Sequence, residues 1–250
     1  MVTDDLFLID STILLKACET SFLGSKLLLA PDGRDQTQTF GFIRDLFRIR
    51  NKLSIRRAII IFGQDSMSFS SDDALSDILA FLNEIKVPFI RDNIAKVGEI
   101  CFQLASSARW ILTENRAMTQ LVSDGLGVIL MDGSRIPDSF TITEKTNLGI
   151  IPDQVPALMA LSDGKDAPLK HHKAVRLLEI YSSLDALLSD CTSVPSSDWK
   201  RKLAPKENLL LKKEIEYRFR SDFRVAFPPV VDTLFENTAE SVNVLQHRGF

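Results

Sequence analysis

Side chains that could hold a metal ion or move a proton gather where three predicted strands end. Asp10 closes the apolar run LFLID, Asp65 follows the run RAIIIF, and the run RWILT leads into residues 113–117. The carboxyl ends of parallel strands meet at one edge of a sheet, so we expect these positions to lie close together. Carboxylates there would be suitable ligands for a hard divalent cation. After the third strand, where an acid would be expected, the chain offers Asn115 and Ala117 instead.

Other catalytic and metal-binding patterns find little support in the residues. His171 and His172 are adjacent and point in different directions on a helix, so contact with phosphate or plain exposure is a better expectation than a metal site. The sequence contains no GxSxG segment, P-loop or dinucleotide-binding fingerprint. The three cysteines are far apart in the sequence and form no CxxC pair, so we expect neither a disulfide framework nor a zinc site.

Length and composition indicate a globular protein with a sizeable core. A chain of 250 residues suffices for one large domain or for a core with a small appendage. The start, MVTDDLFLID, lacks the basic and apolar regions of a signal peptide, and no apolar run approaches the length of a membrane span. We therefore expect an intracellular protein of a reducing compartment, without a membrane association.

The formal net charge of −3 is unevenly distributed along the chain. Residues 165–224 carry 13 Lys and Arg against 9 Asp and Glu, so the C-terminal third is basic. Such a region is suited to contact with a polyanion, although a solvated helix surface explains the count equally well. The candidate nucleic-acid contacts form two groups, Lys170, His171, His172, Lys173 and Arg176 in the first and Lys200, Arg201 and Lys202 in the second.

Strand-like and helix-like segments alternate through the first 145 residues. We expect strands at 6–10, 57–62, 87–90, 109–113 and 126–131, and helices at 39–53, 71–85 and 99–108. A further helix is expected after the strand at 109–113, carrying residues 120–122. Near-continuous apolar strands are typical of a parallel sheet covered on both faces. The alternation therefore predicts an α/β fold.

After about residue 150 the pattern becomes helical. We expect helices at 151–162, 170–181 and 182–190, a linker at 192–205 and a charged helix at 206–223. The tail from residue 226 carries a double proline and no strong pattern.

The order of these segments resembles the 5′→3′ exonuclease domain at the N-terminus of bacterial DNA polymerase I and its flap endonuclease relatives. FLIDSTILLKA is similar to the family's opening strand and helix, and ILTENRAMTQLVSD to its segment TGDRDLLQLVS. LGIIPDQVPALMALSDGKDAP resembles GVxPEQVxDxxALxGDSSDNIPG, and KAVRLLEIYSSLDALL the helix after the family's helix-hairpin-helix. The resemblance covers residues 5–225. It implies a PIN-like, mostly parallel sheet flanked by helices and followed by a helix-hairpin-helix region.

The resemblance also implies a two-metal site, of which this chain keeps only part. The acids that match the family's are Asp10, Glu99, Asp163 and Asp166, and the positions that depart from acids are Gly63, Lys96, Gly98, Asn115 and Ala117. Residues Asp10, Asp163 and Asp166 could hold one Mg²⁺ or Mn²⁺ weakly, but a pair of ions about 4 Å apart needs more ligands. We expect Lys96, with Arg116, to pair with the four remaining acids and replace the metal charge. A helix N-cap is the alternative role for Asp10.

Two structural elements with which the family binds DNA, a basic arch and a Gly-rich hairpin, are shortened or altered in this sequence. Only GQDSMSFSS, without Lys or Arg, lies between residues 62 and 72, where the family inserts a basic arch. The Gly-rich hairpin of the form GVPGIGPKTA is replaced by APLKHHKAV, which has no glycine. The basic side chains that remain predict nonspecific, salt-sensitive contact rather than a fixed register.

We therefore expect three regions: a PIN-like 5′-nuclease core at 1–160, a degenerate helix-hairpin-helix and helical region at 161–225, and a tail at 226–250. The leading functional hypothesis is a catalytically degenerate 5′→3′ exonuclease homologue that binds nucleic acid, DNA rather than RNA, without a cofactor. One alternative is an active minimal nuclease that uses Mg²⁺ or Mn²⁺. Another is a scaffold that binds protein partners within a nucleic-acid-processing complex.

Overall fold

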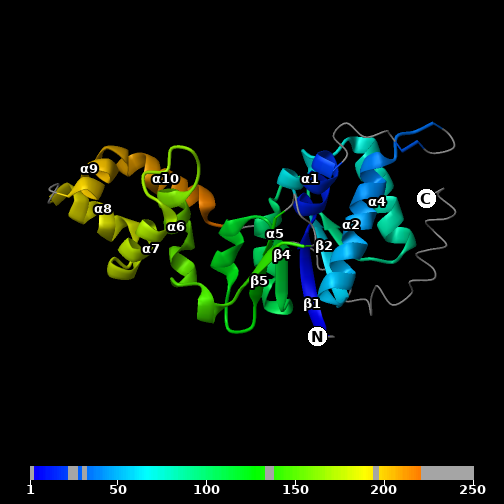
Figure 1. The fold of residues 1–250 in the computed structure, drawn as a ribbon, viewed down its shortest axis with the longest axis horizontal. Coiled ribbons are helices and arrows are strands. Elements are labelled where there is room, and N and C mark those ends of the chain that lie inside the picture. Colours follow the sequence, from blue (N-terminus) through cyan, green and yellow to red (C-terminus); the bar gives the residue numbers. More distant parts are fainter. Residues whose placement is uncertain (1–2, 22–27, 30–32, 133–137, 194–196, 221–250) are drawn as a thin grey trace.

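A mostly parallel sheet forms the centre of the larger part of the molecule. The computed structural model describes residues 3–21, 28–29, 33–132, 138–193 and 197–220, and within them six strands form one sheet in the order β3-β2-β1-β4-β5-β6 (Figure 1). The strands are β1 (Thr3–Asp10), β2 (Ile55–Phe62), β3 (Phe89–Arg91), β4 (Trp110–Thr113), β5 (Gly127–Met131) and β6 (Phe140–Thr143). Only β6 runs antiparallel to its neighbour. The predicted α/β fold is confirmed, with β6 as an additional edge strand.

Helices cover both faces of this sheet, which explains the apolar runs in its strands. The covering helices are α1 (Ser11–Ser21), α2 (Thr37–Leu53), α3 (Gln64–Met67), α4 (Asp72–Glu84) and α5 (Val97–Leu104). Because neighbouring strand residues point to opposite faces, Phe7 and Ile9 join a core with α1, α2 and α4, whereas Leu8 and Ile111 join a second core with α5. All of these side chains are buried, as expected for a sheet between two helical layers.

The beginnings and ends of two covering helices follow from local sequence. Helix α4 begins after Ser71, whose hydroxyl accepts a hydrogen bond from the Ala74 backbone N–H at 3.2 Å. Asp72 and Asp73 in its first turn suit the positive end of the helix dipole. Helix α2 ends at Leu53 and is capped by Ser54, which adopts the left-handed conformation with φ 53°. These features hold the helices that support β1 and β2.

The C-terminal region is a separate cluster of helices beside the sheet (Figure 1). It contains α6 (Val155–Ser162), α7 (His171–Ile180), α8 (Leu184–Ser193), α9 (Asp198–Leu203) and α10 (Glu207–Tyr217), which share a core of their own. Helix α9 lies within the predicted linker at 192–205, so that prediction is wrong: Trp199 packs against Tyr181 and joins this core. No helix in the described ranges is long and apolar enough to cross a membrane. The predicted tail at 226–250 lies outside the described residues.

Candidate functional site

Asp10 ends β1 at the edge of the sheet where the site was predicted. Its side chain is 2% exposed. One carboxylate oxygen, Oδ1, accepts the Thr12 backbone N–H at 2.9 Å, and Oδ2 accepts the Thr113 hydroxyl at 2.6 Å. Burial raises the pKa of Asp10 from 3.8 to about 6, because water no longer solvates the charged form. Asp10 therefore acts as a cap for α1 and as a tie between β1 and β4, the alternative role that its sequence position allowed.

Asp65 is a second acid near Asp10, and its charge contributes to the raised pKa of Asp10. It lies in α3, and its Oδ1 accepts the backbone N–H of Val97 at 2.9 Å, at the first residue of α5. Asp65 was among the carboxylates expected at this edge of the sheet, but it matches no position of the family motif and was therefore not counted with the family's acids. Its proximity to Asp10 agrees with the expectation that the ends of these strands lie close together.

Gly63 stands where an acid would end β2, and the backbone of the next loop fills the space beside it. A Cβ added at Gly63 would lie 2.3 Å from the backbone nitrogen of Val97 and 2.8 Å from the backbone carbon of Lys96. The Gln64 N–H also donates to the Ala95 carbonyl at 2.8 Å, which holds the two segments together. This packing excludes any side chain at position 63, including a carboxylate.

Lys96 and Glu99 meet at the start of α5 through the backbone and not through an ion pair. Glu99 Oε2 accepts the Lys96 backbone N–H at 2.9 Å, which is a capping-box contact. Within the described residues, no ion pair joins Lys96 or Arg116 to Asp10, Glu99, Asp163 or Asp166. The expectation that these cations replace a metal charge is therefore wrong. The carboxylates of Asp10, Glu99 and Asp163 accept hydrogen bonds from backbone N–H groups or hydroxyls instead.

The segment after β4 turns into a 3₁₀ helix, η2 (Arg116–Leu121), rather than the expected α-helix. Asn115 caps it, because its side-chain oxygen accepts the Ala117 N–H at 2.9 Å. Ala117 is 2% exposed, so its methyl group lies in the protein interior. Both family acid positions therefore have a structural role here, one as a neutral cap and the other as packing.

Gly98 is covered by the chain that follows α10. A Cβ added at Gly98 would lie 2.3 Å from Cε1 and 2.6 Å from Cζ of the Phe219 ring, which packs into the core on the α5 face of the sheet. We call residues 217–219 the closing segment. Gln120 fixes it, since its Nε2 donates to the Tyr217 carbonyl at 2.8 Å and its Oε1 accepts the Phe219 N–H at 3.4 Å.

Asp163, at the end of α6, is held by the same closing segment. The hydroxyl of Tyr217 donates to Asp163 Oδ2 at 2.7 Å, and burial together with this contact raises the pKa of Tyr217 to about 12. Asp166 is exposed, and its backbone carbonyl accepts a hydrogen bond from Lys206 Nζ at 3.2 Å. Nowhere in the described ranges do three or more His, Cys, Asp or Glu side chains gather as metal ligands. These acids do not fit a two-metal centre.

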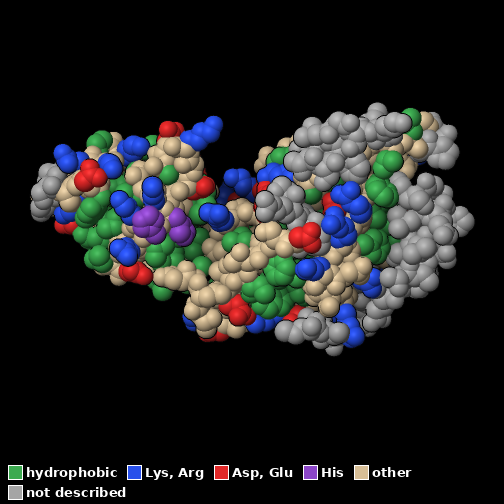
Figure 2. Space-filling view, in the orientation of Figure 1, with side chains coloured by type: hydrophobic (Ala, Val, Ile, Leu, Met, Phe, Trp, Pro, Cys, Tyr) green, Lys and Arg blue, Asp and Glu red, His purple; other side chains and the backbone are tan. Residues whose placement is uncertain are grey.

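The predicted nucleic-acid contacts fall into an exposed group and a partly buried one. Lys170, His171, His172, Lys173 and Arg176 are all exposed at the start of α7 and along it. Figure 2 shows the two histidines of this group side by side among Lys and Arg side chains. In the second group, Lys200 is 8% exposed and pairs with Asp190 at 2.7 Å, so its ammonium points into the protein. Arg201 and Lys202 are exposed.

The fold can now be compared with known proteins. No protein-family model and no curated protein sequence matches the chain. The catalytic core of Rad2 in complex with DNA substrate superposes with a TM-score of 0.66 and 11% identity, covering 99% of this chain and 88% of that one. Flap endonuclease-1 from Methanococcus jannaschii gives a TM-score of 0.60 and 9% identity, covering 100% and 88%. A bacteriophage T5 flap endonuclease in a pseudo-enzyme–product complex with DNA and metal ions gives 0.57 and 10%, covering 85% and 88%. The chain has the fold of the 5′-nuclease and flap endonuclease structures, as its motifs predicted.

Proposed function

We propose that this protein is a 5′-nuclease homologue that has lost two-metal catalysis and acts as a nucleic-acid-binding module, with DNA preferred over RNA. The observation that carries the proposal is the closing segment. Phe219 lies against Gly98, a position where the family motif has an acid, and the hydroxyl of Tyr217 donates to Asp163, an acid that this chain keeps. A pair of divalent ions requires several carboxylates around a shared space. In the described part of the chain, no three His, Cys, Asp or Glu side chains gather in that way.

The electrostatics of the strand ends support the same proposal. Both carboxylate oxygens of Asp10 are already engaged, one by the Thr12 backbone N–H and the other by the Thr113 hydroxyl. Asp65 and Glu99 each use a carboxylate oxygen to cap the start of α5. Asp10, Asp65 and Glu99 thus each accept hydrogen bonds from within the protein.

The basic side chains on α7 are the proposed binding site for nucleic acid. They are exposed and belong to one helix, so they can approach successive phosphates without a rearrangement of the fold. Lys and Arg that neutralise phosphates release counterions, which gives binding a steep dependence on salt. The Rad2 and T5 structures of this fold contain DNA, which favours DNA as the ligand.

Fluorescence anisotropy with labelled single-stranded DNA, duplex DNA and RNA of equal length tests whether these side chains bind nucleic acid. We expect the logarithm of the binding constant to fall linearly with the logarithm of salt concentration, and Lys170→Glu to reduce the slope by about 1 or more. Lys212→Glu is the matched control, because Lys212 is exposed on α10, outside the basic group. Absence of binding to all three nucleic acids at low salt would contradict the proposal and favour a protein-binding scaffold.

A second candidate, a nuclease with a single metal ion, rests on the proximity of Asp10 and Asp65. Mg²⁺ can be held by one or two carboxylates with water completing its shell. Calorimetric titration with Mn²⁺ distinguishes the two candidates. The single-ion nuclease requires one saturable site that Asp65→Ala removes, whereas our proposal predicts no such site.

A further inference from the structure

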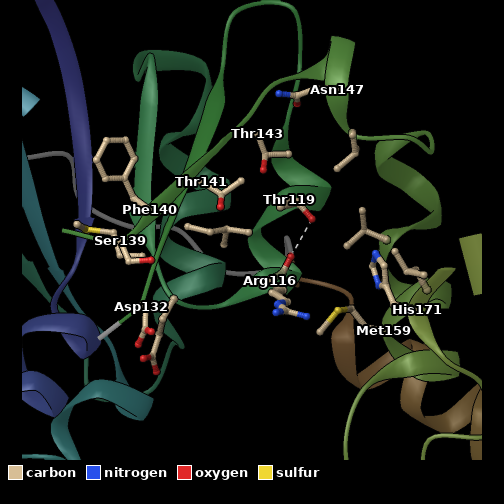
Figure 3. Close-up of a pocket in the computed structure, with 16 residues that line it drawn as sticks. Arg116, Thr119, Asp132, Ser139, Phe140, Thr141, Thr143, Asn147, Met159 and His171 are labelled. Atoms are coloured by element: carbon tan, nitrogen blue, oxygen red, sulfur yellow. Dashed lines mark hydrogen bonds between the residues drawn. The ribbon is translucent and has the colours of Figure 1, made fainter. Parts of the chain in front are cut away.

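A pocket lies between the outer strand β6 and the first helices of the C-terminal cluster, and Asp10 is not among its lining residues (Figure 3). Its volume is about 700 Å³. Pockets of about 300–1,000 Å³ are typical of sites for small ligands. The proposed binding of nucleic acid along α7 shares His171 with this pocket but assigns no role to its other lining residues.

One end of the pocket is positively charged. Arg116 from η2 and His171 from the start of α7 both line it, and Figure 3 shows both side chains reaching into the same region. Arg116 is exposed, and within the described residues its guanidinium forms no ion pair; its backbone carbonyl accepts the Thr119 hydroxyl at 2.8 Å. An Arg guanidinium matches the geometry of a phosphate and can donate two hydrogen bonds to it.

The pocket is also lined by two acids, Glu114 and Asp132, and neither neutralises the positive charge of Arg116. Glu114 pairs with Lys16 on α1, so its charge is balanced. Asp132, just after β5, is drawn away from His171 in Figure 3. An anionic group would therefore be directed to Arg116 and His171.

The wall between these ends is apolar, with hydroxyl side chains opposite. Leu158 and Met159 of α6 are each 7% exposed and line the pocket, and Thr141 of β6 contributes an exposed hydroxyl. A ligand that fits has one phosphate, a group that accepts and donates hydrogen bonds, and a flat apolar body. A nucleotide combines these properties. One Arg and one His suit a single phosphate better than a polyphosphate.

We propose that this pocket binds a nucleoside monophosphate, with the phosphate between Arg116 and His171. The nucleotide is either free or the phosphorylated 5′ end of a single strand. The strand-end source rests on the proposed nucleic-acid-binding function, whereas the free-nucleotide source does not. Thr141→Trp would block the pocket from the exposed edge strand without changing charge.

The test measures binding of the full chain to four probes: AMP, adenosine, and a pentanucleotide with a 5′ phosphate or a 5′ hydroxyl. We expect the phosphate to strengthen binding roughly tenfold, as for one charge-assisted contact to Arg. Arg116→Ala and Thr141→Trp should remove this difference. Arg91→Ala, a matched loss of an exposed arginine on the opposite edge strand β3, should leave it unchanged.

The probes separate the two sources and the two proposals. Tight binding of AMP supports a free nucleotide, and tight binding of only the phosphorylated pentanucleotide supports a strand end. If longer 5′-hydroxyl strands bind but the phosphate has no effect, the pocket proposal is overturned and the nucleic-acid-binding function stands. If AMP binds through Arg116 while no strand binds, the pocket proposal holds and the nucleic-acid-binding function fails. A phosphate effect that survives Arg116→Ala also overturns the pocket proposal.

Discussion

The ring of Phe219 occupies the space into which any side chain at Gly98 would project, with ring atom Cε1 2.3 Å from the position of an added Cβ. This contact joins α5 to the chain after α10 and places the closing segment at the predicted site. It predicts a specific pattern of stability changes.

Gly98→Ala should destabilise the protein by about 1–3 kcal/mol, because the added methyl group displaces the Phe219 ring. In a Phe219→Ala background the same change should become neutral or stabilise by up to about 1 kcal/mol, since alanine favours a helix over glycine. Urea unfolding of the single and double variants measures both effects. Gly125→Ala is the control, because nothing lies within 4 Å of an added Cβ there. Equal destabilisation with and without Phe219 would contradict the packing role.

Gly63→Ala should cost more than Gly98→Ala, about 3 kcal/mol or more, because its Cβ would overlap the backbone nitrogen of Val97 rather than the end of a side chain. Phe219→Ala should not reduce the destabilisation caused by Gly63→Ala, since no atom of Phe219 is among the three nearest to the added Cβ. Urea unfolding in both backgrounds provides the measurement. If Phe219→Ala restored the stability of Gly63→Ala, the destabilisation at both glycines would come from the Phe219 ring, which would contradict this prediction.

The sequence predicted the sheet well and the site less well, for a physical reason. The strands ending at Asp10, Phe62 and Thr113 are buried on both faces, so their apolar runs could be recognised locally. Strand β6 was missed because it lies at an edge, where Thr141 and Ile142 are exposed and no apolar run forms. The departures at Gly63 and Gly98 were visible in the sequence. The groups that pack against these two glycines could not be predicted from the sequence, because Phe219 contacts Gly98 only through the tertiary fold.

Asp10 should make the stability of the protein depend on pH. Its pKa is raised from 3.8 in the unfolded chain to about 6 in the folded protein, so its stabilising contribution is full below pH 3.8 and is lost as the pH rises through 6. The loss is on the order of 3 kcal/mol. Urea unfolding between pH 4 and pH 7 should show this decline, and Asp10→Asn should remove it from the pH profile. An NMR titration that gives Asp10 a pKa near 3.8 would contradict the burial of its carboxyl group.

Tyr217 should ionise only at high pH. Burial and the hydrogen bond to Asp163 raise its pKa to about 12, so this contribution to stability is present below pH 10 and is lost as the pH rises through 12. Tyr217→Phe should cost about 1 kcal/mol through the lost hydrogen bond. The sequence has two tyrosines, so the difference between the ultraviolet pH titrations of wild type and variant isolates Tyr217. A difference curve centred near pH 10 would show that Tyr217 is not held against Asp163.

Loss of two-metal catalysis is the central claim, and cleavage of a labelled 5′-flap DNA in excess Mn²⁺ or Mg²⁺ tests it most directly. The purified wild type should give no product above the level of Asp10→Ala, because the described acids do not gather into a site that could hold a pair of ions. Metal-dependent product from the wild type that disappears in Asp10→Ala would contradict the claim and establish an active nuclease.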